Sequence, residues 1–375
     1  MAEQPDHVTR LTRWQRIGIA ALGLLCAGLV GAVLFIWSGY YNVAAGREHL
    51  SLTTWILEQV RDQSIKSHSD DIEVPELDDP NLIRLGAAHY QGACVFCHGS
   101  PDQPRNPIVA NMLPAPPDLS ASSEYSPAEV YWIVLNGLKY TGMPAWPAEG
   151  RGDEVWALVA LIESFKTSAG GSGHGLANDD RPAAKPGHAL AEGSEPPVLT
   201  DCVRCHGDET AAPISNLVPS LSGLSKDYIM RSLEEYRSNR RQSGIMEPVA
   251  FALTPEVMEK LATYYASLTP LPLPEINAPE AIDNGRRIAA EGVPEADVPA
   301  CLACHGASRS NNFPALDGQP AAYLEAQLRL WHSGGRALTG YGAIMAPVAR
   351  RMTAQQIRDV SLYFQARSVQ GGSSP

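Results

Sequence analysis

Cys-Val-Phe-Cys-His at residues 94–98 decides what this chain folds around, and its spacing returns as Cys-Val-Arg-Cys-His at 202–206 and Cys-Leu-Ala-Cys-His at 301–305. Two thiols separated by two residues can add to the two vinyl groups of one porphyrin, and the next residue places an imidazole beneath the iron. We therefore predict three covalently bound haem c groups. The predicted attachment cysteines are Cys94, Cys97, Cys202, Cys205, Cys301 and Cys304, and the predicted proximal iron ligands are His98, His206 and His305.

A zinc site or disulfides are the alternative explanations of these cysteines. Zinc needs four nitrogen or sulfur ligands at one point, whereas each motif by itself offers three. Disulfides suit an exported protein, but they do not explain a histidine in the same place three times. The seventh cysteine, Cys26, lies in an apolar run, where a thiol behaves as a small hydrophobic residue.

Two methionines recur at a constant distance from the second and third motif histidines. The interval is 40 residues from His206 to Met246 and again from His305 to Met345. It is equal although the second motif has four more residues before its Pro-x-Leu-x-Gly sequence and four fewer after it. A fixed interval indicates that the histidine and the methionine of each pair bind the same iron. We predict Met246 and Met345 as axial iron ligands, each in a loop before the last helix of its unit; core filling, the commoner role of methionine, is the alternative.

The first motif has its own candidate, Met143, in Thr-Gly-Met-Pro, 45 residues after His98. Met112 is its competitor. A thioether ligand raises the reduction potential of haem iron. Iron closed on both faces has no open position for a substrate, so we predict no catalytic residues.

Charge and hydropathy bound the location of the chain. The net charge of −12 over 375 residues argues against a nucleic-acid partner. Residues 17–37 are uncharged and long enough to cross the ~30 Å hydrocarbon layer. Arg10, Arg13 and Arg16 precede this run and the next basic residue is Arg47, which predicts a cytoplasmic N-terminus and a periplasmic remainder at a bacterial inner membrane. A cleaved signal peptide is the alternative.

Composition shifts divide the rest of the chain. Residues 47–68 have helical periodicity and are either a spacer on the membrane surface or a docking face for a membrane partner. Further helices are predicted at 81–91, at 153–165 and from Pro127, with Ser126 as its cap. The predicted segments are a cytoplasmic tail and transmembrane anchor (1–40), a juxtamembrane helix and acidic connector (41–80), a first haem domain (81–168), a flexible Gly/Ser-rich linker (169–188), a second haem domain (189–270) and a third haem domain (271–370).

The segments that contain the second and third motifs repeat one another. Pro-x-Leu-x-Gly at 219–223 returns at 314–318, and Met-x-Pro-Val-Ala at 246–250 returns at 345–349. The proline-rich stretch 269–279 is semi-rigid and is predicted to keep these two haem domains close. The first haem domain, on its Gly/Ser tether, is expected to move relative to them.

With these motifs, residues 190–370 resemble the dihaem class I cytochromes c of the "c-four" type. Residues 81–168 look like a third class I cytochrome c domain of the Gly-Met-Pro kind, and Tyr-Asn-Val-Ala-Ala at 41–45 resembles the start of membrane-bound bacterial cytochromes c. The resemblance implies an all-α fold: one N-terminal transmembrane helix followed by three small class I cytochrome c domains. In each domain the N- and C-terminal helices should cross beside the haem. The second domain departs from this pattern, because Glu-Pro-Pro at 195–197 predicts a short or irregular lead helix.

The resemblance also implies respiratory electron transfer in the periplasm by a carrier that is not itself an enzyme. The expected partners are a quinol-oxidising cytochrome bc-type complex or a soluble cytochrome, a terminal oxidase or reductase, and membrane lipid around the N-terminal helix. An obligate haem subunit of a membrane dehydrogenase or oxidase is the alternative, and a haem peroxidase is less favoured. A basic rim near the third haem is a candidate docking surface, although solvated arginines or propionate partners explain it equally well. Its members would be Arg336, Arg350, Arg351 and Arg358.

Overall fold

The regular secondary structure of the protein is helical throughout the residues that the computed structural model describes, which are 12–100, 104–119, 124–167, 196–306 and 310–367. Within these ranges no β-strand forms, and Val293 and Val298 form an isolated bridge. The predicted all-α class is therefore confirmed. The predicted linker 169–188 and residues 1–11 of the predicted cytoplasmic tail lie outside the described residues.

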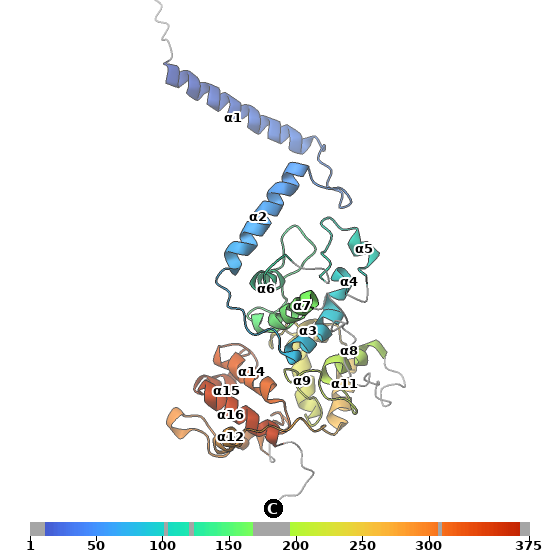
Figure 1. Cartoon of the computed structure of the whole chain (residues 1–375), viewed down its shortest axis with the longest axis vertical. Coiled ribbons are helices and arrows are strands. Elements are labelled where there is room, and N and C mark those ends of the chain that lie inside the picture. The colour runs from blue at the N-terminus through green and yellow to red at the C-terminus, as the bar shows by residue number, and fades with distance from the viewer. Residues whose placement is uncertain (1–11, 101–103, 120–123, 168–195, 307–309, 368–375) are drawn as a thin grey trace, which may run out of the picture.

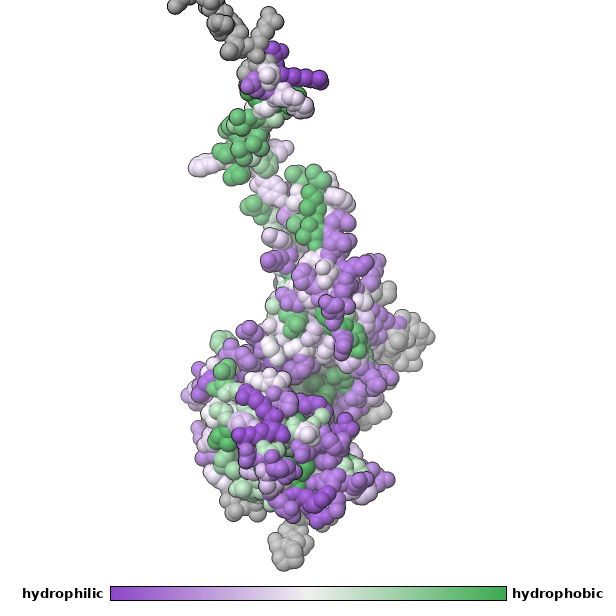
Figure 2. Space-filling model, turned by 90° about the vertical axis from the view of Figure 1, so that its left-hand side faces the viewer, coloured by the Kyte–Doolittle hydropathy of each residue, from purple (hydrophilic) through white to green (hydrophobic). Residues whose placement is uncertain are grey.

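Helix α1 (Arg13–Trp37) stands apart from the rest of the protein (Figure 1). A capping box begins it: Thr12 Oγ1 accepts from Gln15 N, and Gln15 Oε1 accepts from Thr12 N. None of its residues is buried, and its apolar side chains form the green band at the top of Figure 2. The helix is long and apolar enough to cross a membrane, a criterion that a signal sequence near an N-terminus also meets.

Helix α2 (Ser51–Ser69) confirms the helix expected at 47–68 and connects α1 to the body of the protein. Its second half packs against α6 (Pro127–Asn136): Ile65 is fully buried, and Asp62 accepts a hydrogen bond from Tyr125 Oη at 3.1 Å. Its first half exposes the apolar side chains next to α1 (Figure 2). These are Leu52, Trp55, Ile56 and Val60.

The segment around the first motif is built on two crossing helices, α3 (Pro80–Ala93) and α7 (Val155–Thr167). They approach closely at Gly86, where an added Cβ would lie 2.0 Å from the carbonyl oxygen of Ala157. The predicted cap of α6 is confirmed, since Ser126 Oγ accepts from Glu129 N at 3.4 Å. The shorter elements of the segment are α4 (Val95–His98), α5 (Pro107–Ala110) and the 3-10 turn η1 (Gly152–Glu154).

The third motif has the same crossing, and the second has a reduced version. Helix α12 (Pro279–Glu291) crosses α16 (Ala354–Ala366) at Gly285, where an added Cβ would lie 2.1 Å from the carbonyl oxygen of Asp359. In the second segment α8 (Pro196–His206) already contains the motif, and the residues before Pro196 lie outside the described ranges. The remaining elements are α9 (Lys226–Arg237), α10 (Met246–Phe251), α11 (Pro255–Ser267), η3 (Pro294–Ala296), α13 (Leu302–His305), α14 (Ala321–His332) and α15 (Gly342–Arg350).

The buried apolar side chains form separate cores, each drawn from residues around one motif. Hydrogen bonds join the three parts. Tyr323 N donates to the carbonyl oxygen of Asn216 at 3.0 Å, and Arg84 Nε donates to that of Ile214 at 3.1 Å. Residues 214–216 therefore contact both the first and the third part. The first part lies directly against the second in the described structure (Figure 1).

Replacing either crossing glycine by alanine should push the paired helices apart. We expect Gly86→Ala and Gly285→Ala each to lower the free energy of unfolding by about 1–3 kcal/mol, because the new methyl group meets a backbone carbonyl and not a side chain that can turn away. Denaturant titration of the haem-loaded protein measures the change. Gly340→Ala is the matched control, since nothing lies within 4 Å of its added Cβ. Equal stability of the Gly285→Ala variant and the native protein would contradict the close-approach argument.

Candidate haem-binding site

Each motif is closed by a turn of helix. The amide N–H groups of Cys97 and His98 both donate to the carbonyl oxygen of Cys94, at 3.0 and 2.9 Å. The third motif repeats this turn, and the second forms the C-terminal end of α8. Side chains three and four positions apart share one face of a helix. Both thiols and the imidazole of each motif therefore project to the same side, as attachment to one porphyrin requires.

The three motif histidines have the same hydrogen-bond partner. In each case Nδ1 lies 3.0 Å from the carbonyl oxygen of a proline: His98 on Pro117, His206 on Pro219 and His305 on Pro314. A carbonyl oxygen only accepts, so Nδ1 carries the proton and Nε2 keeps its lone pair for a metal. Burial lowers the pKa of His98 and of His206, which also favours the neutral imidazole.

Pro117 is a functional residue that the sequence analysis missed. Pro219 and Pro314 stand out through the internal repeat, whereas Pro117 lies among several other prolines in an irregular stretch. The signal was present as Pro-x-Leu at 117–119, the core of the repeated pattern. Spacing did not reveal it, because the histidine-to-proline separations are 19, 13 and 9 residues.

A single cavity of about 1590 Å³ connects the three motifs. All the predicted attachment cysteines, histidines and methionines line it, together with many apolar side chains. His89, Trp146 and Arg204 line the cavity where the first part meets the second. The residues present therefore fit porphyrins, because each motif brings a thiol pair and an imidazole to a cavity with apolar walls that the predicted methionines also line.

The predicted methionine ligands are half-buried and face this cavity. Met143 lies in a loop, as predicted, where its N–H donates to Thr141 Oγ1 at 3.0 Å. Met246 and Met345 were predicted in loops, and this was wrong, because Met246 begins α10 and Met345 lies inside α15. Pro248 is compatible with a helix there because the first-turn N–H groups of a helix lack intrahelical partners.

The competitor Met112 also lines the cavity, close to the Met143 loop. Its Cε would lie 2.5 Å from a Cβ added at Gly142, the residue before Met143. Met112 and Met143 therefore lie close together in the cavity, and substitution of each shows which one ligates the first iron.

Neither alternative explanation of the cysteines finds support. No disulfide joins cysteines in the described ranges. Nor do three or more His, Cys, Asp or Glu side chains gather there at one point that could hold a metal ion. Burial raises the pKa of the thiols of Cys94 and Cys202 to about 12, which disfavours the thiolates that zinc requires. Neutral thioethers are compatible with this environment.

Two arginines add positive charge to the cavity wall. Arg241, which the sequence analysis did not single out, is 5% exposed; it donates to Ser232 Oγ at 3.1 Å and to Tyr323 Oη at 3.3 Å. Arg336, expected on a basic rim, instead lines the cavity and donates to Gln327 Oε1 at 2.7 Å. Arg350, Arg351 and Arg358 are exposed. Arg336 thus differs from the rim prediction, because its side chain turns inward between α14 and α9.

Helical units in which Cys-x-x-Cys-His turns line an apolar cavity define a c-type cytochrome, which binds haem covalently and transfers electrons. Comparison with known proteins agrees. The model of the family "Cytochrome C oxidase, cbb3-type, subunit III" matches residues 81–162. The thiosulfate dehydrogenase electron acceptor of Stutzerimonas stutzeri (strain A1501) is 34% identical over 180 residues, 46% of this chain and 82% of that protein.

Cytochrome c4 of Thiocapsa roseopersicina is 32% identical over 195 residues, 51% of this chain and 99% of that protein. The solved structure of cytochrome c4 from Acidithiobacillus ferrooxidans is 32% identical, covers 44% of this chain and 99% of its own, and gives a TM-score of 0.41. The chain belongs to the cytochrome c4 family of c-type cytochromes.

Substituting the predicted methionine ligands should separate the haems by potential. We expect Met143→His to lower the potential of one haem by on the order of 0.1 V, because a harder ligand stabilises ferric iron. Met246→His and Met345→His should each lower a different one. Potentiometric titration followed by absorbance measures this. Met112→Leu is the control. If Met112→Leu shifts the potential of a haem that Met143→His leaves unchanged, Met112 is the ligand of the first haem.

Proposed function

We propose that the chain is a membrane-anchored, periplasmic electron carrier with three haem c groups, acting in a respiratory chain. The cavity supports this most strongly, since all three motifs and all three predicted methionines line it. In this proposal residues 81–168, 189–270 and 271–370 each hold one haem. The axial pairs are His98 with Met143, His206 with Met246, and His305 with Met345.

When bound, the haem irons supply the one-electron chemistry, and the protein supplies position and environment. The proline carbonyls orient the imidazoles by accepting from Nδ1. The predicted methionines Met143, Met246 and Met345 would bind the irons through sulfur, which would leave no open position for water or substrate and would favour the reduced form. Apolar walls lower the local dielectric, so the buried Arg241 and the half-buried Arg336 act strongly on charge inside the cavity.

In the proposed topology α1 crosses the inner membrane with its N-terminus in the cytoplasm. The arginines before α1 and the lack of basic residues directly after it support this orientation. The exposed apolar half of α2 then lies at the periplasmic surface of the inner membrane, where the amphipathic ring of Trp55 suits the interface between lipid and water. The haem domains stay near the membrane, within reach of a membrane-bound donor or acceptor such as a bc-type complex or an oxidase.

A second candidate role is the electron-accepting haem subunit of a dehydrogenase. The relatives named thiosulfate dehydrogenase electron acceptor favour it, with 34% and 35% identity to this chain. The two roles share their chemistry and differ in whether a donor enzyme stays bound. Purification of the full chain from its native membrane separates them, since a stoichiometric dehydrogenase subunit would favour the second role.

The proposal predicts three haems per polypeptide, all closed to external ligands. Pyridine haemochrome analysis of the purified protein should return three, and the ferric spectrum should contain the near-infrared band of thioether-ligated iron. Ferrous protein exposed to carbon monoxide should bind little at any haem. A count below three would overturn the proposal, and rapid carbon monoxide binding at one haem would indicate a peroxidase-like open site.

A further inference from the structure

The methionine segments of the first and second haem domains pack directly against each other. Trp146, three residues after Met143, lies on the backbone of Gly244, two residues before Met246. A Cβ added at Gly244 would lie 2.2 Å from the indole ring, so only glycine allows this approach. The axial-ligand region of one domain is therefore part of the surroundings of the next.

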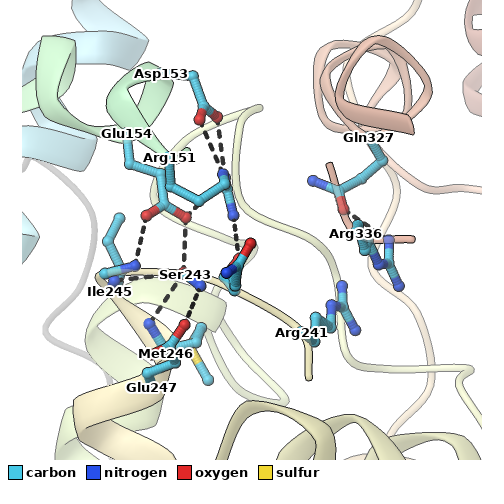
Figure 3. Close-up of polar contacts among 12 residues, drawn as sticks. Arg151, Asp153, Glu154, Arg241, Ser243, Ile245, Met246, Glu247, Gln327 and Arg336 are labelled. Atoms are coloured by element: carbon cyan, nitrogen blue, oxygen red, sulfur yellow. Dashed lines mark hydrogen bonds and ion pairs between the residues drawn. The ribbon is translucent and has the colours of Figure 1, made fainter. Parts of the chain in front are cut away.

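Glu154 reaches across the same boundary from the first domain. Its Oε1 accepts from Ser243 Oγ at 2.7 Å, and its Oε2 accepts from Gly244 N at 2.7 Å (Figure 3). The Glu154 side chain is 9% exposed. A buried carboxylate with hydrogen bonds to both oxygens is held tightly, because loss of either bond leaves the buried oxygen with fewer donors.

Arg151 holds Glu154 in this position. Its Nη2 lies 2.7 Å from Glu154 Oε1, and its Nε and Nη2 bind the two oxygens of Asp153 at 2.8 and 2.9 Å. Its Nη1 donates to the carbonyl oxygen of Gln242 at 2.6 Å (Figure 3). The first domain thus contacts three consecutive residues, 242–244, that lead to Met246.

Ser243 connects Glu154 to the backbone of Met246. Its hydroxyl donates to Glu154, which turns the oxygen lone pairs toward the amides that follow. Ser243 Oγ accepts from Ile245 N at 3.3 Å and from Met246 N at 3.1 Å. Glu247 Oε1 accepts from Ser243 N at 2.8 Å and completes the turn at the start of α10.

We propose that Glu154 is a positioning residue for the second haem: through Ser243 and Gly244, the first haem domain holds the Met246 thioether in its ligating position. This inference rests on the proposed function, in which Met246 ligates the second iron. It deepens that function, because the junction between the first two haems then forms part of the ligand support of the second. Ligation at the second haem depends on contact between domains that the chain connects through a long tether.

Imidazole binding to the ferric protein tests this proposal, because an added ligand enters only where the methionine sulfur leaves the iron. We expect Glu154→Ala to increase the affinity of one haem for imidazole about tenfold, the effect of losing one or two hydrogen bonds that hold the segment. The near-infrared thioether band should weaken by about a third at imidazole concentrations that leave the native protein intact. Glu154→Gln should restore most of the native behaviour, since its amide oxygen still accepts from this segment.

Glu163→Ala is the matched control. It removes another carboxylate of the same domain that is ion-paired at 2.7 Å, with Lys166, away from residues 242–246. Imidazole affinity should stay native there at all three haems. The haem that responds to Glu154→Ala must be the one that Met246→His alters. No change in Glu154→Ala, or a change at the haem marked by Met143→His, would overturn the inference.

Ser243→Ala provides a second test if Glu154→Ala fails to retain three haems. It removes the hydroxyl that links Glu154 to the Met246 amide and should weaken ligation at the same haem several-fold. In the double variant the two effects should not add, because they act through one chain of hydrogen bonds. Failure of Met246→His to alter any haem would instead refute the ligand assignment, and with it the proposed function, independently of Glu154.

Discussion

The hydrogen bond from each motif histidine to a proline carbonyl is the contact on which the haem sites depend. It fixes the imidazole tautomer and turns Nε2 into the cavity, and it ties the helical turn of the motif to the loop that follows. The loops that deliver these carbonyls differ in length, yet all three reach the same 3.0 Å geometry. The hydrogen bond of the motif histidine is therefore kept in each unit, whereas the length of the loop that supplies the carbonyl is not.

Around that contact, the first and third parts are held by a helix crossing at glycine, α3 on α7 and α12 on α16. In the second part the described helix before the motif, α8, continues into the motif itself, and neighbouring parts support this unit. It lies between the other two, and residues 214–216 bond to both. Its methionine segment is held by Arg151 and Glu154 of the first domain. The second part is thus in contact with both of its neighbours.

This arrangement suits a relay. Electron transfer between closed haems needs short separations that persist, and one cavity lined by all three motifs provides proximity. Hydrogen bonds between domains limit how far the separations vary. The apolar first half of α2 and the isolated α1 extend away from this body, as the proposed membrane anchor requires (Figure 2).

The sequence alone was sufficient for the all-α class, the main helices and the Ser126 cap, because these depend on local spacing and capping chemistry. The Cys-x-x-Cys-His motifs likewise indicated covalent haem from five adjacent residues. Only the tertiary structure decided that Pro117 supports His98, that Arg336 turns inward, and that Glu154 and Trp146 reach residues 242–246. These contacts join residues far apart in the chain, and their spacing follows no period, so they exist only once the domains have packed.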